Sequence, residues 1–165
     1  MFTAPADTIE VTLRLFAATL IGSCIGLDRE VRRKPAGVRT HALVSLGAAL
    51  VTLVVVRLPP DSYEHVDAVS RAIQGIIAGV GFLGGGAILK SDERDIIHGL
   101  TTAASIWLVA SLGIACGAGQ WVAALIALAL ALFILIVGGP VDNLVHRIVS
   151  RRKKLPDDVA HDALG

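Results

Sequence analysis

Five long apolar stretches alternate with short polar segments along the chain. They cover residues 9–27, 41–58, 72–89, 99–116 and 120–138. A bilayer core needs about 20 helical residues to cross it, and these stretches reach or approach that length. The runs are continuous, whereas a transmembrane β-barrel would show alternating segments of about ten residues. The pattern therefore predicts an all-α membrane protein with five transmembrane helices.

A soluble bundle of buried helices is the alternative explanation for this pattern. Residues 100–139 contain no charged side chain. A single soluble core could not hide five helices that are apolar on every face. The hydrophobic fraction of 54% also exceeds the value of about 45–50% that is usual for soluble domains. We therefore reject the soluble alternative.

Positive charges gather in three of the segments that flank the apolar stretches. Twelve of the 15 lysines and arginines lie between the first and second stretches, between the third and fourth, or after the fifth. The other three are Arg14, Arg57 and Arg71. Lys and Arg near span ends collect on the cytoplasmic side of a membrane. The N-terminus is therefore predicted to lie outside and the C-terminus in the cytoplasm.

Residues 1–140 form the predicted membrane domain, and residues 141–165 form a basic cytoplasmic tail that is expected to be partly disordered. Apolar positions in residues 141–151 recur at helical spacing, which indicates an amphipathic extension along the membrane surface. The basic residues 151–154 suit anionic lipid better than nucleic acid. The first apolar stretch lacks a preceding basic region, so it is predicted to be a retained helix rather than a cleaved signal.

Glycines recur four residues apart in several of the stretches. This spacing places small residues on one helix face and lets two backbones approach closely. Packing within the chain is the favoured interpretation, and homo-oligomerisation is the alternative. The run Gly84–Gly86 is denser than packing requires and predicts a break in the third helix. The helix-packing residues are Gly22 and Gly26, Gly75 and Gly79, and Gly113 and Gly117.

Polar residues and glycines at the predicted cytoplasmic ends of the first four helices form a candidate functional cluster. Polar groups within a membrane are costly and are therefore candidates for function. Opposite charges at neighbouring helix ends could pair with each other or bind an anion or a cation. Anchoring of the helix ends is the alternative. The cluster consists of Asp28, Arg29, Glu30, Arg39, Thr40, Gly84, Gly85, Gly86, Gly99, Thr101 and Thr102.

Arg14 is the one charge well inside a predicted span. Glu10 precedes it by four residues, which is the favoured orientation for an ion pair on a helix. A structural pair is the favoured interpretation, and a role in transport or gating is the alternative.

The sequence contains no recognisable catalytic or cofactor-binding motif. It has no nucleophile–base pairing, no phosphate-binding loop and no dinucleotide fingerprint. The histidines and cysteines do not follow a metal-ligand spacing. We therefore expect no enzyme activity, no cofactor, no metal ion and no nucleic-acid partner.

Three motifs in the chain resemble those of a known family. Residues 22–30 (GSCIGLDRE), followed by residues 34–43 (KPAGVRTHAL), are similar to the first signature of the MgtC/SapB membrane proteins. Residues 75–89 (GIIAGVGFLGGGAIL) are similar to the second signature and residues 99–107 (GLTTAASIW) to the third. The chain resembles a short form of these proteins, without the soluble C-terminal domain of ACT-like fold that some members carry.

The resemblance implies a bacterial inner-membrane protein with five spans. It also implies adaptation to low Mg²⁺, a link to virulence, inhibition of the ATP synthase and control of membrane potential. The chain departs from the family pattern at three positions: Asp28 stands where Glu is usual, Gly85 where Ala is common and His98 where Arg is common.

A non-enzymatic regulatory protein that binds another membrane complex is the favoured function. Its partners would be the lipid bilayer and a membrane protein complex such as the ATP synthase. A transporter or channel for Mg²⁺ or H⁺ is the alternative, with Arg14, Gln74, Asp28 and Glu30 along its path. The regulator is favoured because a transporter needs polar groups at membrane depth, and the third stretch offers only Gln74.

Overall fold

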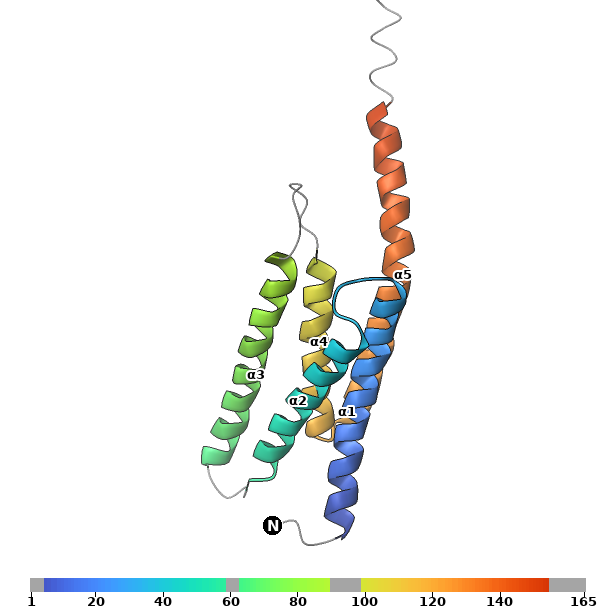
Figure 1. The fold of residues 1–165 in the computed structure, drawn as a ribbon. Helices are drawn as coiled ribbons and strands as arrows, with labels where there is room; N and C mark the ends of the chain where they lie inside the picture. The colour runs from blue at the N-terminus through green and yellow to red at the C-terminus, as the bar shows by residue number, and fades with distance from the viewer. Residues whose placement is uncertain (1–4, 59–62, 90–98, 155–165) are drawn as a thin grey trace, which may run out of the picture. The chain divides into compact units, whose positions relative to one another are not determined.

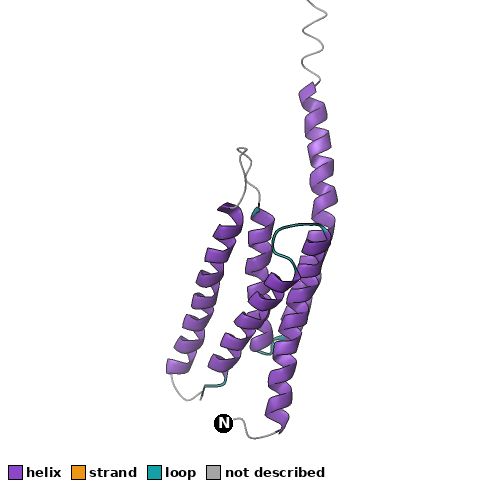
Figure 2. Cartoon of the chain, viewed as in Figure 1, coloured by secondary structure: helices purple, strands orange, loops and turns teal. Residues whose placement is uncertain are grey.

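Five α-helices account for the secondary structure of residues 5–58, 63–89 and 99–154, the ranges that the computed structural model describes (Figures 1 and 2). Each helix contains a stretch long and apolar enough to cross a membrane. The prediction of an all-α protein with five transmembrane helices is therefore confirmed, and the orientation of its termini stays a prediction. The helices are α1 (Pro5–Val31), α2 (Val38–Val56), α3 (Tyr63–Leu89), α4 (Leu100–Gly117) and α5 (Trp121–Lys154).

The chain divides into two compact units, the first ending at Ala129 and the second beginning at Leu130. The first unit contains α1 to α4 and the beginning of α5. The second contains the rest of α5, which stays helical through Pro140 as far as Lys154. Residues 141–151 are thus helical, as their spacing predicts. The predicted disorder of the tail falls on residues 155–165, which lie outside the described residues.

Helix α1 approaches α2 closely through two glycines. A Cβ atom added at Gly22 would lie 2.5 Å from the carbonyl oxygen of His41, and one at Gly26 would lie 2.6 Å from the Cα of Val38. Real Cβ atoms do not approach other atoms so closely, so a larger residue at either position would push the helices apart. The favoured interpretation of this pair, packing within the chain, agrees with these contacts.

Helix α4 also approaches α2 closely, through a second pair of glycines. Gly113 faces the carbonyl of Ser45, and Gly117 faces the carbonyl of Ala49. Helix α2 therefore packs against both α1 and α4, which also contact each other. Close approach of backbones increases van der Waals contact, which is the main attraction between helices when the surrounding solvent is lipid.

Helix α3 is the least covered of the helices in the first unit. Only 6% of its apolar window is buried, compared with 50% for α4. Gly84 faces Ala103 of α4, with a built Cβ 3.5 Å from the Ala103 Cβ. Cβ atoms built at Gly75 and Gly79 would meet no other atom within 4 Å. Packing within the described chain thus does not account for this pair.

The observed extent of α3 differs from the sequence prediction in two ways. It runs without a break through Gly84–Gly86, so the predicted break is wrong. A glycine lowers helix stability by about 1 kcal/mol, whereas an unpaired backbone group in a bilayer costs several, so the helix persists. The helix also begins at Tyr63, ahead of the apolar stretch. Its polar first turns contain an ion pair between Asp67 and Arg71 at 2.7 Å.

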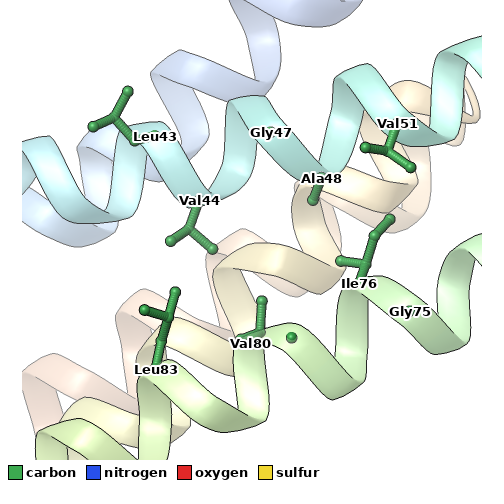
Figure 3. A pocket seen from close by; sticks show the side chains of 10 residues that line it. Leu43, Val44, Gly47, Ala48, Val51, Gly75, Ile76, Val80 and Leu83 are labelled. Carbon is green, nitrogen blue, oxygen red and sulfur yellow. The ribbon is translucent and has the colours of Figure 1, made fainter.

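An apolar groove of about 430 Å³ lies between α2 and α3 (Figure 3). Val44 and Ala48 line it from α2, and Ile76, Val80 and Leu83 line it from α3. Every side chain in its lining is apolar, and glycines of both helices complete it. The groove therefore suits apolar chains rather than ions.

Candidate polar site where α1, α2 and α4 meet

The end of α1 is shaped by a turn that holds polar side chains against α2 and α4. The N–H of Lys34 donates to the carbonyl of Arg29, and the N–H of Arg33 donates to that of Glu30, both at 2.9 Å. Arg33 has a left-handed backbone with φ of 53°. Together these features form the hydrogen-bonding pattern that commonly ends a helix. The turn lets the chain reverse direction while Arg29 remains inside the bundle.

Glu30 connects the end of α1 to the beginning of α2. Its Oε2 accepts a hydrogen bond from the N–H of Val38 at 2.9 Å. The N-cap residue of α2 is Gly37, which has no side chain to cap the helix. A carboxylate at a helix N-terminus is favourable because the first N–H groups are unpaired and the helix dipole is positive there. Glu30 thus acts as a cap supplied by the preceding helix.

Arg29 is the charged residue at the centre of this junction. It is only 3% exposed, and its Nη2 donates to Oγ1 of Thr102 at 2.7 Å. The two residues lie far apart in the sequence, so this bond ties the end of α1 to the first turn of α4. The Nε of Arg29 is buried and has no hydrogen-bond partner. In the described ranges, no carboxylate forms an ion pair with Arg29.

His41 links α2 to α4 beside Arg29. It is fully buried, and its Nδ1 donates to the carbonyl of Gly37 at 3.0 Å, because a carbonyl can only accept. Its Nε2 lies 3.0 Å from Oγ of Ser105, which in turn lies 2.8 Å from the carbonyl of Thr102. Ser105 has one hydroxyl proton. If His41 is neutral, its Nε2 is an acceptor, and the Ser105 hydroxyl can donate either to Nε2 or to the Thr102 carbonyl, but not fully to both.

Arg29, His41, Thr102 and Ser105 together form what we call the polar site. Of the predicted cluster, the structure brings Arg29 and Thr102 into direct contact. Asp28 instead pairs with Arg32 on its own helix at 2.8 Å. Three other members are exposed on the surface of the described structure, namely Arg39, Thr40 and Thr101.

The glycines of the predicted cluster have separate roles in the structure. Gly99 is the N-cap residue of α4, with φ of 93°, and a Cβ there would also lie 2.6 Å from the carbonyl oxygen of Ala87. Gly84 faces α4, whereas Cβ atoms built at Gly85 and Gly86 would meet nothing within 4 Å. His98, a departure from the family pattern, lies outside the described residues.

Two members of the polar site were not among the predicted site residues, namely His41 and Ser105. The sequence carries a signal for each. His41 follows Gly37 by four residues and Ser105 follows Thr102 by three, so each pair lies on one helix face. Because the two helices come together only in the fold, the contact between His41 and Ser105 could not be predicted from the spacing alone.

Arg14 ties α1 to the other end of α4. Its Nη1 donates to the carbonyl of Gly117 at 2.6 Å, and the predicted ion pair with Glu10 is present. Glu10 also lies 3.5 Å from Arg57 at the end of α2. The cation sits where the negative end of the α4 dipole favours it. These contacts agree with a structural role for Arg14.

The polar site lies within the part of the chain that matches a known protein family. The chain matches the MgtC family over residues 15–144. The chain belongs to the MgtC family. All four residues of the polar site fall within the matched range, and so do the glycines that hold α2 between α1 and α4. Arg14 lies just before the match begins.

Several curated proteins are similar to this MgtC-family chain. It is 43% identical over 128 residues to Protein SrpB of Synechococcus elongatus, an alignment that covers 73% of this chain and 70% of SrpB. It is 42% identical over 130 residues to Protein SapB of Bacillus subtilis, with 77% of this chain and 54% of SapB covered. It is 43% identical over 115 residues to Protein MgtC of Salmonella typhimurium, with 70% and 46% covered.

The alignments thus span about half the length of SapB and MgtC. No solved structure matches the chain. Five apolar helices and membership of the MgtC family together establish a multi-pass membrane protein.

Proposed function

We propose that this MgtC-family protein is a non-enzymatic regulator in the bacterial inner membrane that acts by binding another membrane complex. Family membership and the resemblance to MgtC/SapB proteins support a link to Mg²⁺ homeostasis. The same resemblance makes the ATP synthase the first partner to test. Inhibition of the ATP synthase would in turn affect the membrane potential. The resemblance also supports a link to virulence. The positive charges support an external N-terminus and a cytoplasmic C-terminus.

The observation that carries this proposal is the close packing of α1, α2 and α4. Gly22 of α1 and Gly113 of α4 both press against α2 near Ser45. An ion crossing between these helices would need room and polar groups to replace its hydration shell. The contacts at Ser45 leave no such room, which favours a binding protein over a transporter.

The uncovered face of α3 supports the second part of the proposal, a membrane partner. Gly75 and Gly79, which also line the groove beside α2, and Gly86 leave the backbone open there, and Phe82 is 83% exposed. Small residues mark surfaces where transmembrane helices pack closely. A partner helix, including one from a second copy of the chain, would find close backbone contact on this face.

Ion flux in proteoliposomes tests the regulator against the transporter. Purified protein would be reconstituted with Mg²⁺ or H⁺ indicators and compared with empty vesicles and with the double variant Asp28→Asn/Glu30→Gln. We expect no flux above that of empty vesicles. Flux that the wild type shows and the double variant loses would overturn the regulator and support the transporter.

A crosslinking experiment tests the partner surface. A photoreactive amino acid would replace Phe82 on α3, and in a matched control it would replace Trp107 on α4, which is also exposed. We expect the Phe82 position to give a discrete protein adduct in native membranes, with a subunit of the ATP synthase or a second copy as the candidates. Adducts with lipid alone at both positions would contradict a partner on α3.

A further inference from the structure

Helix α1 places one arginine near each end of α4, and the two arginines have different electrostatic surroundings. Arg14 pairs with Glu10 and donates to the carbonyl of Gly117 at the C-terminus of α4, where the helix dipole is negative. Arg29 donates to Thr102 in the first turn of α4, where the dipole is positive. In the part of the chain that the structure describes, Arg29 therefore forms no ion pair, whereas Arg14 does.

The guanidinium of Arg29 is both buried and incompletely hydrogen-bonded. The residue is 3% exposed, and its Nε has no partner. The carboxylate of Asp28, its neighbour in sequence, acts on Arg29 through its charge, but it pairs with Arg32 through Oδ1 at 2.8 Å, and its buried Oδ2 has no hydrogen-bond partner. A cation withdrawn from water without a hydrogen-bonded counter-charge is costly, and an anion bonded to it would lower that cost.

The first turn of α4 offers several hydrogen-bond donors that are not used within the described chain. A guanidinium only donates, so Oγ1 of Thr102 accepts from Arg29, and the hydroxyl proton of Thr102 remains free to donate. Among the described residues, that proton has no acceptor. The first N–H groups of α4 have no earlier helical carbonyl to bind, and Gly99 provides no side-chain cap.

We infer that Arg29 and the first turn of α4 bind an oxyanion of the phosphate class. Helix N-termini bind phosphate through their N–H groups and the positive end of the dipole. Here a buried cation reaches the same turn from another helix and orients the Thr102 hydroxyl as a further donor. Leu100 and Thr101 are exposed, so the outer side of the turn can be approached from outside the bundle, whereas Thr102 is only 2% exposed and lies inside it.

The ligand is a phosphate group because the donors come from two helices and from several directions. A tetrahedral oxyanion can accept hydrogen bonds from all of these directions at once. A carboxylate has only two oxygens, which lie in one plane, and can accept from fewer of them. Two sources share this chemistry: the headgroup phosphate of an anionic lipid and inorganic phosphate. The inference goes beyond the proposed regulatory function and does not depend on it, because the site could exist in a transporter as well.

Thermal unfolding of the full chain in neutral detergent tests the site. Delipidated protein would be titrated with sodium phosphate, against sodium chloride at matched ionic strength. It would also be titrated with phosphatidylglycerol, against a phosphate-free galactolipid. We expect a saturable rise in the unfolding midpoint with at least one phosphate ligand. A response to phosphatidylglycerol alone would identify a lipid headgroup, and a response to sodium phosphate would identify the free anion.

Four variants separate this site from general charge attraction. Arg29→Gln and Thr102→Val should each weaken binding by about tenfold, the usual effect of losing a hydrogen bond to a charged group. Thr102→Ser keeps the hydroxyl and should bind like the wild type, which keeps the test valid if Arg29→Gln does not fold. Lys34→Gln removes an exposed cation of the same turn and should have little effect.

Three results would overturn the inference. The first is the absence of a saturable shift with both phosphate ligands in folded wild-type protein. The second is equal binding by Thr102→Val and Thr102→Ser. The third is a loss in Lys34→Gln as large as that in Arg29→Gln, which would indicate attraction to the basic turn as a whole.

Discussion

The glycines of α1 and α4 and those of α3 have the same four-residue spacing and opposite surroundings. Gly22 and Gly113 press against the α2 backbone, where even one added carbon would collide. Gly75 and Gly79 leave open space for such a carbon. In α1 and α4 the small residues are used to bring helices of the same chain together. In α3, Gly84 faces α4, but Gly75 and Gly79 are not used in this way within the described chain.

The difference shows that a small-residue pattern specifies the possibility of close packing but not the partner. Within α1, α2 and α4, polar groups reinforce the packing at both ends. Arg14 bonds α1 to the end of α4, and His41 bonds α2 to Ser105. On α3 the corresponding polar contacts, such as Asp67 with Arg71, stay on one helix. Helices α1, α2 and α4 thus form a cross-linked core, and α3 leaves a face uncovered within the described chain.

The largest expected effect comes from adding a methyl group to the packed glycines. Gly22→Ala places a Cβ 2.5 Å from the carbonyl oxygen of His41, so the two backbones must separate. We expect a loss of about 3 kcal/mol in the free energy of unfolding, at the upper end for an overpacked core. Reversible denaturation in SDS, followed by tryptophan fluorescence, would measure it. A loss below half of that would show that α1 and α2 can move apart easily.

A smaller effect is expected when a hydrogen bond of the polar site is removed. Ser105→Ala leaves Nε2 of the buried His41 without its partner, which should cost about 1–3 kcal/mol. Ser70→Ala on α3 is the matched control, because Ser70 bonds only Gln74 on its own exposed helix surface. The control should stay within about 0.5 kcal/mol of the wild type. Equal losses in the two variants would remove the distinction between the cross-linked core and α3.

The two arginine ion pairs provide the next comparison. Arg14→Gln removes a bond to the C-terminal carbonyl of α4 and should cost about 1 kcal/mol. Arg71→Gln breaks the exposed pair with Asp67 and should change stability by less than about 0.5 kcal/mol. Both losses can be measured by the same denaturation assay in detergent. If the two variants behaved alike, Arg14 would serve as a surface charge and not as a link between helices.

The helices could be predicted from the sequence because their signal is local. Continuous apolar runs indicated all five spans, and the ion pair of Glu10 with Arg14 followed from their spacing on one helix. The positions of the helix ends were predicted less accurately than the presence of the helices. Polar turns at the start of α3 carry no apolar signal, and the glycine run Gly84–Gly86 suggested a break that the bilayer environment disfavours.

The polar site could be predicted only in part because it is assembled from three helices. Motifs at the helix ends indicated Arg29 and Thr102, but not that they bond to each other. His41 was not predicted because one histidine in an apolar stretch gives no indication of which helix it will face. Spacing identifies the face of a helix, and the partner of that face depends on how the helices pack.

The smallest expected effect is that of adding a methyl group to a glycine of α3 that has open space around it. This variant is the direct counterpart of Gly22→Ala. Gly79→Ala adds a Cβ that meets no atom within 4 Å, and alanine favours a helix over glycine by up to about 1 kcal/mol. The variant should therefore be as stable as the wild type or slightly more stable in detergent. A loss resembling that of Gly22→Ala would show that this face of α3 is covered in the folded protein. Unchanged stability together with a weaker Phe82 crosslink in native membranes would show that the face is kept open for a partner.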